Sequence, residues 1–282
     1  MNIHKWIALL TILLLLPATG RSNDEAAELA KQLNNPVASL ISVPFQSNWD
    51  FGLGEGSGQK FTMNFQPVVP ISITEGWNLI IRTIVPVIDQ NGIFPGSGSQ
   101  AGLGNTTQSF FLSPKAPGPG GIIWGVGPVG YYPTSTDRLL GPEKWGLGPT
   151  LVALAQPGGW TVGVLANQIW TVGGDSSEQD VNAAFIQPFL AYTTKTHTTF
   201  TLNSESTYDW ENDQWTIPLN LMVTQVLKIG KLPVSIQLGG RYYAEAPEGG
   251  SDWGVRLTFT LLFPTGKQKT APAPSDGVGL AK

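Results

Sequence analysis

The chain has 282 residues, with 16 Lys and Arg, 20 Asp and Glu, and no cysteine. Charged residues make up 13% of it, well below the roughly 25% that is usual in soluble domains. The missing cysteine excludes disulfides, thiol nucleophiles and thiolate metal sites, and the net charge of −4 argues against a nucleic-acid partner.

The first predicted element is an apolar segment, Trp6–Leu16, which follows the short positive start His4-Lys5. It is shorter than the about 20 residues that a membrane-spanning helix needs. The small residues around Gly20 are typical of a cleavage site. We therefore expect residues 1–22 to be a signal peptide, removed after Sec-type export.

A single helical pattern follows in residues 23–36. Ala26, Leu29, Ala30 and Leu33 recur at helical spacing, and Pro36 ends the pattern. This predicts a short N-terminal helix, which we expect to lie in the periplasm.

The rest of the chain alternates between apolar and polar residues. The last segment places Trp253, Phe259 and Phe263 on one face, and Arg256 and Thr258 on the other. Such alternation is typical of β-strands with one apolar and one polar face. The predicted strands are 39–51, 59–71, 76–88, 107–114, 121–132, 143–155, 159–171, 182–194, 198–210, 214–228, 232–244 and 252–263.

Most of these strands are longer than the usual globular strand and match a tilted membrane crossing of about 9–11 residues. We therefore predict an all-β fold: a transmembrane antiparallel up-and-down β-barrel of about 12 strands over 37–264, with a flexible periplasmic tail at 265–282. Alternation by itself would also fit a soluble sandwich of two sheets.

The connections support a membrane barrel. Those after odd-numbered strands are mostly longer and carry most of the acidic residues, as expected for loops outside the cell, whereas the short turns would face the periplasm. One long connection, Asp89–Thr106, is expected to fold inward as a constriction.

Tryptophans gather near the predicted strand ends, where indole rings favour the boundary between lipid and water. They would form an aromatic girdle of Trp49, Trp77, Trp124, Trp145, Trp160, Trp170, Trp210, Trp215 and Trp253.

A set of polar residues falls on the predicted inner face, because an ionised side chain facing lipid in mid-membrane costs about 2–4 kcal/mol. The candidate lumen-lining residues are Arg82, Arg241, Arg256, Glu205, Asn64, Gln66, Asn220 and Gln237. Two interpretations stay open: a weakly anion-favouring constriction, or charges that pair and fill the interior.

No catalytic residue, metal site or cofactor is predicted, and we do not expect an enzyme. Gly125-Val126-Gly127-Pro128-Val129-Gly130 matches a dinucleotide fingerprint in its letters but lacks the following helix. His197 is expected in an exposed turn. The acid-rich segment 175–180 fits no known cation loop and is interpreted as a solvated loop, whose acids divalent ions would bridge to lipopolysaccharide.

Several segments resemble a bacterial family of outer-membrane transporters grouped with the meta-pathway phenol-degradation proteins. They are 35–54 (NPVASLISVPFQSNWDFGLG), 67–89 with its WNLIIRTIVPVI core, 102–114 and 124–154. The resemblance implies an outer-membrane barrel and transport, often of aromatic compounds, and it implies no set of functional residues. The last strand, ending at Phe263, is also similar to the strand that the barrel assembly machinery reads.

The sequence thus predicts a channel in the bacterial outer membrane for passive passage of small-molecule solutes. Its expected partners are outer-membrane lipid, lipopolysaccharide and the barrel assembly machinery. A gated transporter of hydrophobic or aromatic solutes, and a closed structural or adhesive barrel without transport, are the alternatives.

Overall fold

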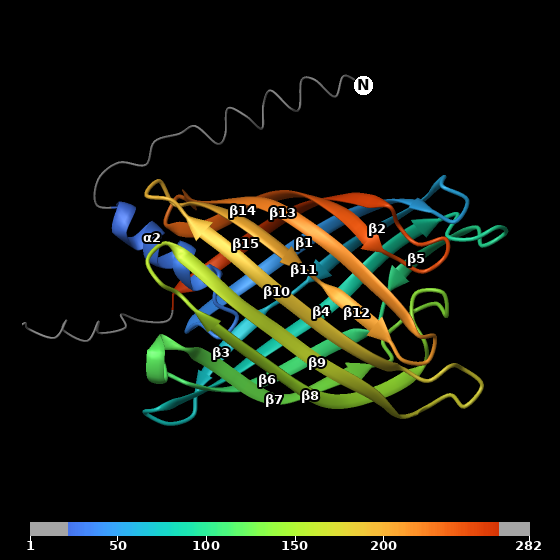
Figure 1. The fold of residues 1–282 in the computed structure, drawn as a ribbon, viewed down its shortest axis with the longest axis horizontal. Helices are drawn as coiled ribbons and strands as arrows, with labels where there is room; N and C mark the ends of the chain where they lie inside the picture. The colour runs from blue at the N-terminus through green and yellow to red at the C-terminus, as the bar shows by residue number, and fades with distance from the viewer. Residues whose placement is uncertain (1–21, 265–282) are drawn as a thin grey trace, which may run out of the picture.

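The computed structural model describes residues 22–264 (Figure 1). The tail at 265–282 and, apart from Ser22, the predicted signal peptide lie outside the described residues. One short helix precedes the strands, as predicted. The elements are α2 (Ser22–Leu33), β1 (Leu40–Leu53), β2 (Gly58–Phe65), β3 (Val68–Ser72), β4 (Trp77–Asn91), β5 (Ser99–Leu103), β6 (Thr106–Pro114), η1 (Pro119–Gly121), β7 (Ile123–Tyr132), β8 (Lys144–Ala155), β9 (Trp160–Gly174), β10 (Asn182–Thr193), β11 (Thr198–Ser204), β12 (Ser206–Asp209), β13 (Gln214–Ile229), β14 (Leu232–Glu245) and β15 (Trp253–Pro264).

These strands form a closed antiparallel barrel with twelve crossings, which confirms the predicted fold class. Three crossings are split in two: β2 with β3, β5 with β6, and β11 with β12. The ring closes where β1 pairs with β15, from Leu40 opposite Pro264 to Phe51 opposite Trp253.

Prolines accompany all three splits. Pro67 lies within the first split. At the second split, the N–H of Gly104 donates a hydrogen bond to the carbonyl of Pro86 on the neighbouring strand β4. The third falls at Glu205, between neighbouring strands that carry Pro188 and Pro218. Because proline has no N–H to donate, the ladder of hydrogen bonds is interrupted at these points.

The two faces of the wall differ as the alternation predicts. In β13, Leu221 is 64% exposed on the outer face, whereas its neighbours Asn220 and Met222 are 0% and 2% exposed toward the interior. The outer face carries most of the exposed large apolar side chains, and the inner face carries most of the buried polar ones.

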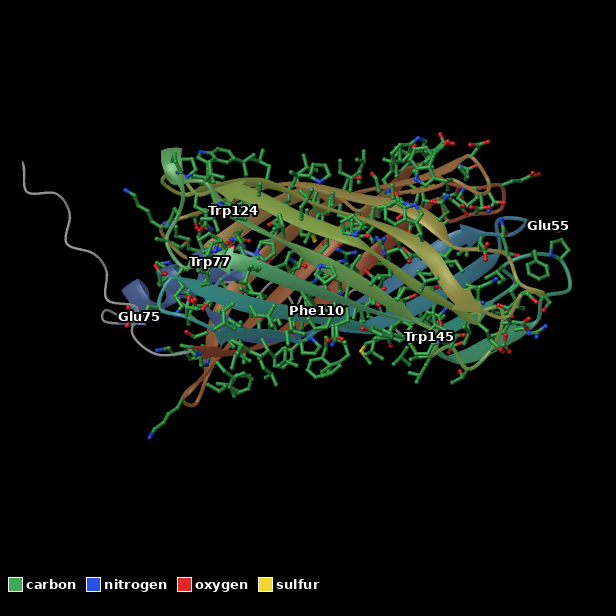
Figure 2. All side chains as sticks on the ribbon, turned by 90° about the horizontal axis from the view of Figure 1, so that it is seen from below. Glu55, Glu75, Trp77, Phe110, Trp124 and Trp145 are labelled. Atoms are coloured by element: carbon green, nitrogen blue, oxygen red, sulfur yellow. The ribbon has the colours of Figure 1, made fainter. Side chains whose placement is uncertain are left out.

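The barrel has two distinct ends (Figure 2). The helix end holds α2 and the connections 73–76, 115–122, 156–159, 194–197 and 230–231, with Trp77 and Trp124 nearby. The loop end holds connections 54–57, 92–98, 133–143, 175–181, 210–213 and 246–252, with Glu55 and Trp145 nearby.

The expectation that Asp89–Thr106 folds inward is wrong. β4 continues to Asn91 and pairs with β5, so this segment extends the wall as a hairpin whose turn uses three glycines with positive φ. The neighbouring connection 133–143 turns inward instead. Its Leu140 is buried, and Gln90 on the inner face donates a hydrogen bond to the carbonyl of Leu139 at 3.0 Å.

Candidate functional site

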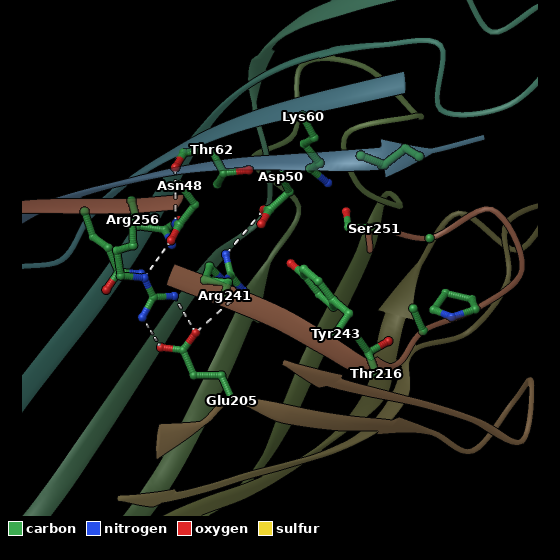
Figure 3. Close-up of a pocket in the computed structure, with 16 residues that line it drawn as sticks. Asn48, Asp50, Lys60, Thr62, Glu205, Thr216, Arg241, Tyr243, Ser251 and Arg256 are labelled. Carbon is green, nitrogen blue, oxygen red and sulfur yellow. Dashed lines mark hydrogen bonds and ion pairs between the residues drawn. The ribbon is translucent and has the colours of Figure 1, made fainter. Parts of the chain in front are cut away.

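An ionic layer crosses the lumen in its loop-end half (Figure 3). Arg256 on β15 donates two hydrogen bonds to the carboxylate of Glu205, at 2.9 and 2.6 Å, and a third to Asn48 on β1 at 2.7 Å. Arg241 on β14 lies 3.3 Å from Asp50, and its Nε donates to Asn220 at 3.1 Å. Four neighbouring strands, β13, β14, β15 and β1, and the strand break at Glu205 therefore contribute to one network.

The break at Glu205 explains how this carboxylate reaches the network. Pro218 lies opposite Glu205 on β13 and has no N–H to donate. The regular ladder of hydrogen bonds is therefore interrupted at Glu205. Two local hydrogen bonds stabilise the irregular backbone: the Ser204 hydroxyl donates to the Pro218 carbonyl at 2.9 Å and contacts the Ser206 hydroxyl at 2.7 Å. The broken strand thereby projects Glu205 toward Arg256.

A cavity of about 350 Å³ lies on the loop side of this layer (Figure 3). Polar side chains line it from β1, β2, β13 and β14, including Lys60, Thr62 and Tyr243. The connection 246–252 contributes Pro247 and Ser251 at its outer edge. A solute arriving from the loop end would meet this chamber first, and we name it the outer chamber.

A second cavity of about 180 Å³ lies on the helix side of the layer. We name it the inner chamber. It is lined partly by the wall, through Arg82, Gln66 and Gln187, and partly by the segment that follows α2, through Pro36 and Ala38. Along β1 its lining ends at Pro44 and that of the outer chamber begins at Gln46, so the two chambers adjoin, and the residues of the ionic layer line the outer one.

The N-terminal segment closes the helix end. Leu29 and Ala30 of α2 are buried against Leu40, Val226 and Leu262, inner-face residues of three strands. Deeper in the barrel, Val37 packs with Ile80 and Phe111 in a second apolar cluster. Hydrogen bonds add to this packing, including one from Gln156 to the backbone carbonyl of Lys31 at 2.9 Å. We call residues 22–38 the N-terminal plug.

The predicted lumen residues gather into several pairs. Arg256 and Arg241 meet carboxylates as described, and Arg82 donates to Gln66 at 3.1 Å. Asn220 donates to Asn203 at 2.8 Å, and Gln237 donates to Thr224 at 2.9 Å. Asn64 lines the outer chamber.

Two residues of the site escaped the sequence analysis. Asp50, 6% exposed, and Lys60 lie directly opposite each other on β1 and β2 and line the outer chamber. Because Asp50 and Lys60 lie close to a glycine-rich turn in the sequence, they were interpreted as loop residues. The detectable signal was their even numbering, since it continues the inner-face alternation of Asn48 and Thr62.

His197 was expected in an exposed turn, but its side chain is buried. It occupies the turn 194–197 with φ of 62°, is 8% exposed, and neither ring nitrogen has a hydrogen-bond partner among the described residues. It lines a cavity of about 330 Å³ together with Glu28 and Lys31 of α2. The plug helix above the turn covers the imidazole, which the local sequence could not reveal.

The acid-rich connection 175–181 is tied to basic residues. Arg138 lies 3.4 Å from Asp175 and 3.2 Å from Glu178, and Lys144 lies 2.8 Å from Asp180. The backbone N–H and the hydroxyl of Ser177, both hydrogen-bonded to Asp175, hold the pKa of that exposed carboxyl below its ordinary value. No cluster of three or more potential metal ligands occurs among residues 22–264.

Within that same range, no helix is long and apolar enough to cross a membrane.

No protein-family model matches the sequence, and no curated protein matches it significantly. Among solved structures, an outer membrane channel from Pseudomonas putida F1 is similar, with a TM-score of 0.61, 17% identity, and coverage of 79% of this chain and 94% of that one. The β domain of the Bordetella autotransporter BrkA (TM-score 0.45, 11% identity, 79% and 99% covered) and OprD from Pseudomonas aeruginosa (0.37, 9%, 79% and 93%) are more distant. The first of these likenesses shows that the chain has the barrel fold of an outer membrane channel.

Proposed function

We propose that this protein is an outer-membrane channel for small molecules that is gated at its helix end by the N-terminal plug. The observation that carries the proposal is the combination of an apolar outer face with a lumen that holds two chambers, the outer one lined mainly by polar side chains and the inner one by both kinds. Lipid would surround the outer face, and water and solute would occupy the chambers. The similar fold of the P. putida channel supports this placement of lipid outside the barrel and solute inside it.

The location follows from this proposal. We propose export through the predicted signal peptide, insertion by the barrel assembly machinery, and an orientation with the loop end outside the cell. Acidic loops would then face lipopolysaccharide, and the plug would face the periplasm. The tryptophans would form the girdle at the two lipid boundaries, since Trp145 and Trp253 are 51% and 52% exposed on the outer face.

Gating is proposed because the plug obstructs the helix end. Solutes that cross the ionic layer would meet Pro36, Val37 and Ala38 before the periplasm. A passage therefore requires the plug to shift. The plug is held mainly by apolar contacts with Leu40, Val226 and Leu262, and a charge placed among them would release it.

The test is single-channel recording of the full mature chain in planar bilayers. Wild type should show rare openings, and Leu29→Asp should show frequent ohmic steps, because an ionised carboxylate cannot remain in the apolar cluster. Glu28→Ala, on the exposed side of the same helix, is the matched control and should behave as wild type.

A complementary variant locks the plug. The chain has no cysteine, so Asn34→Cys with Thr193→Cys introduces one defined pair at a contact of 3.5 Å between plug and wall. A short thiol crosslinker should abolish the openings, and cleavage of the crosslink should restore them. Equal conductance in the wild type, Leu29→Asp and crosslinked proteins would contradict gating by the plug, and silence in all of them would favour a closed barrel.

A second candidate, a gated transporter of hydrophobic or aromatic solutes, is favoured by one observation. An apolar cluster inside the barrel contains Ile80, Phe111 and Leu165, with Phe185 and Phe189 packed against it. Such a surface would bind an aromatic ring, in keeping with the transporters of the phenol-degradation grouping that the sequence resembles. Uptake of a labelled phenol by cells with and without the protein distinguishes this candidate from a general channel.

A further inference from the structure

The charges around the outer chamber are not equally matched. Arg256 forms a two-pronged pair with Glu205, and Arg241 contacts Asp50 at 3.3 Å and lies 3.9 Å from Glu205. The two guanidinium groups thus pair with two carboxylates, and only Oδ1 of Asp50 keeps no hydrogen-bond partner among the described residues. Lys60 is a third cation on the same chamber wall.

Lys60 differs from the two arginines in having no close partner. Among the described residues, no side chain or backbone group lies within hydrogen-bond or ion-pair distance of its ammonium group. Asp50, which faces it across the β1–β2 pair, attracts it electrostatically and contacts Arg241 through Oδ2. The chamber lining thus carries an excess of one positive charge, three cations against the two carboxylates of Asp50 and Glu205.

We propose that the outer chamber binds a small monocarboxylate on the ammonium group of Lys60. This proposal rests on the proposed passage through the lumen and names the solute class that the loop-end half would select. The hydroxyl group of Thr62 lines the same chamber and can donate a further hydrogen bond to the carboxylate.

The single unmatched charge favours a monoanion. Inorganic phosphate, which carries between one and two charges at neutral pH, would leave negative charge uncompensated in the chamber. A cation is disfavoured because the lining already carries three cations, Lys60, Arg241 and Arg256, against the two carboxylates of Asp50 and Glu205. A volume of about 350 Å³ lies at the small end of ligand sites, which span roughly 300–1,000 Å³. It suits a compact acid of the size of benzoate.

The chamber also has a defined cover. The connection 246–252 contributes Pro247 and Ser251 to the lining. It is fastened to β1 and the turn after it by hydrogen bonds from Gly54 N–H to the Gly249 carbonyl at 2.8 Å and from Asp252 N–H to the Phe51 carbonyl at 2.9 Å. The exposed acids of the loop end lie in solvent, where salt screens them.

The test is equilibrium binding to the full mature chain in detergent, measured by saturation-transfer NMR and titration calorimetry with benzoate as the probe. Wild type should bind benzoate more tightly than the isosteric neutral benzamide and more tightly than inorganic phosphate. Lys60→Gln should weaken benzoate binding by about tenfold or more, the loss of one charge-assisted contact. Lys60→Arg should retain most of the affinity.

Lys195→Gln is the matched control, because Lys195 is exposed in a turn at the helix end and should leave binding unchanged. Heat-modifiable migration on gels shows whether each variant retains the closed barrel. Equal affinity for benzoate and benzamide, or unchanged affinity in a folded Lys60→Gln protein, would overturn the proposal. Binding without conductance would instead support the site while contradicting the channel function.

Discussion

Arg256 and Glu205 are joined by two hydrogen bonds across the barrel interior, although 51 residues separate them in the chain. Arg256 is 2% exposed, and it enters this geometry only because the strand breaks at Glu205. The pair links the last strand to the crossing formed by β11 and β12, and several predictions concern it and its surroundings.

Replacing Glu205 with Gln should destabilise the barrel strongly. The substitution leaves a buried guanidinium without its counter-charge, and breaking a buried pair in this way costs about 3–5 kcal/mol. The measurement is the midpoint of thermal unfolding, followed by heat-modifiable migration. Glu211→Gln, in the exposed connection 210–213, is the control and should leave the midpoint unchanged. The double variant Glu205→Leu with Arg256→Met should recover much of the loss, and an equally low midpoint in it would argue against this account.

Replacing His197 with Gly should stabilise the protein by about 1 kcal/mol, because a left-handed backbone costs a residue with a Cβ about 1–2 kcal/mol. The observed φ of 62° and the unpartnered ring nitrogens predict this gain. Thr196→Gly, in the same turn but without a positive φ, should lower the unfolding midpoint instead. A loss of stability in His197→Gly would mean that imidazole packing under α2 outweighs the backbone strain.

The connection 175–181 should loosen in acid. Its Asp175 has a lowered pKa, because the charged carboxylate accepts hydrogen bonds from Ser177. The stabilisation from a lowered pKa is present above the ordinary pKa of aspartate and is lost as pH falls through the lowered one. Cleavage by pepsin in this connection should therefore rise steeply at the acid end of the pepsin range. Asp175→Asn, whose amide oxygen accepts the same bonds without titrating, should show a flatter pH dependence.

The tryptophan girdle predicts a depth profile in lipid. Bromine atoms placed near the headgroups should quench the tryptophan fluorescence of the reconstituted chain more than bromine atoms near the bilayer centre. Single-tryptophan variants retaining Trp77 or Trp145 should both report shallow depths, since these residues lie near opposite ends of the barrel (Figure 2). Strongest quenching from the bilayer centre would contradict the proposed placement.

Much of the fold was predictable because the two sides of each strand face such different surroundings. The alternation around Arg256 and Asn220 located strands, and each predicted strand corresponds to an observed crossing. The splits in three crossings were not predicted, and two of them depend on prolines of neighbouring strands. Pro218, for example, acts on Glu205 only through the pairing of β13 with β11 and β12.

The candidate site was predictable as a list of inward residues and not as a set of partners. Nothing local in the sequence places Asn48 beside Arg256, since they meet only through closure of the ring. His197 illustrates the same limit: its burial depends on a helix more than 160 residues earlier in the chain, near Glu28 and Lys31. Alternation in the sequence indicates on which face of a strand a residue lies, whereas the contacts of that residue depend on how all the strands are arranged around the barrel.

The position of the plug also has a consequence for assembly. Leu29 and Ala30 rest on Leu40 of the first strand and Leu262 of the last, so their seat exists only after the ends of the sheet have joined. An incomplete sheet offers α2 nowhere to dock. We therefore expect the helix to dock only after β1 and β15 have paired, so that the helix end stays open while the barrel is incomplete.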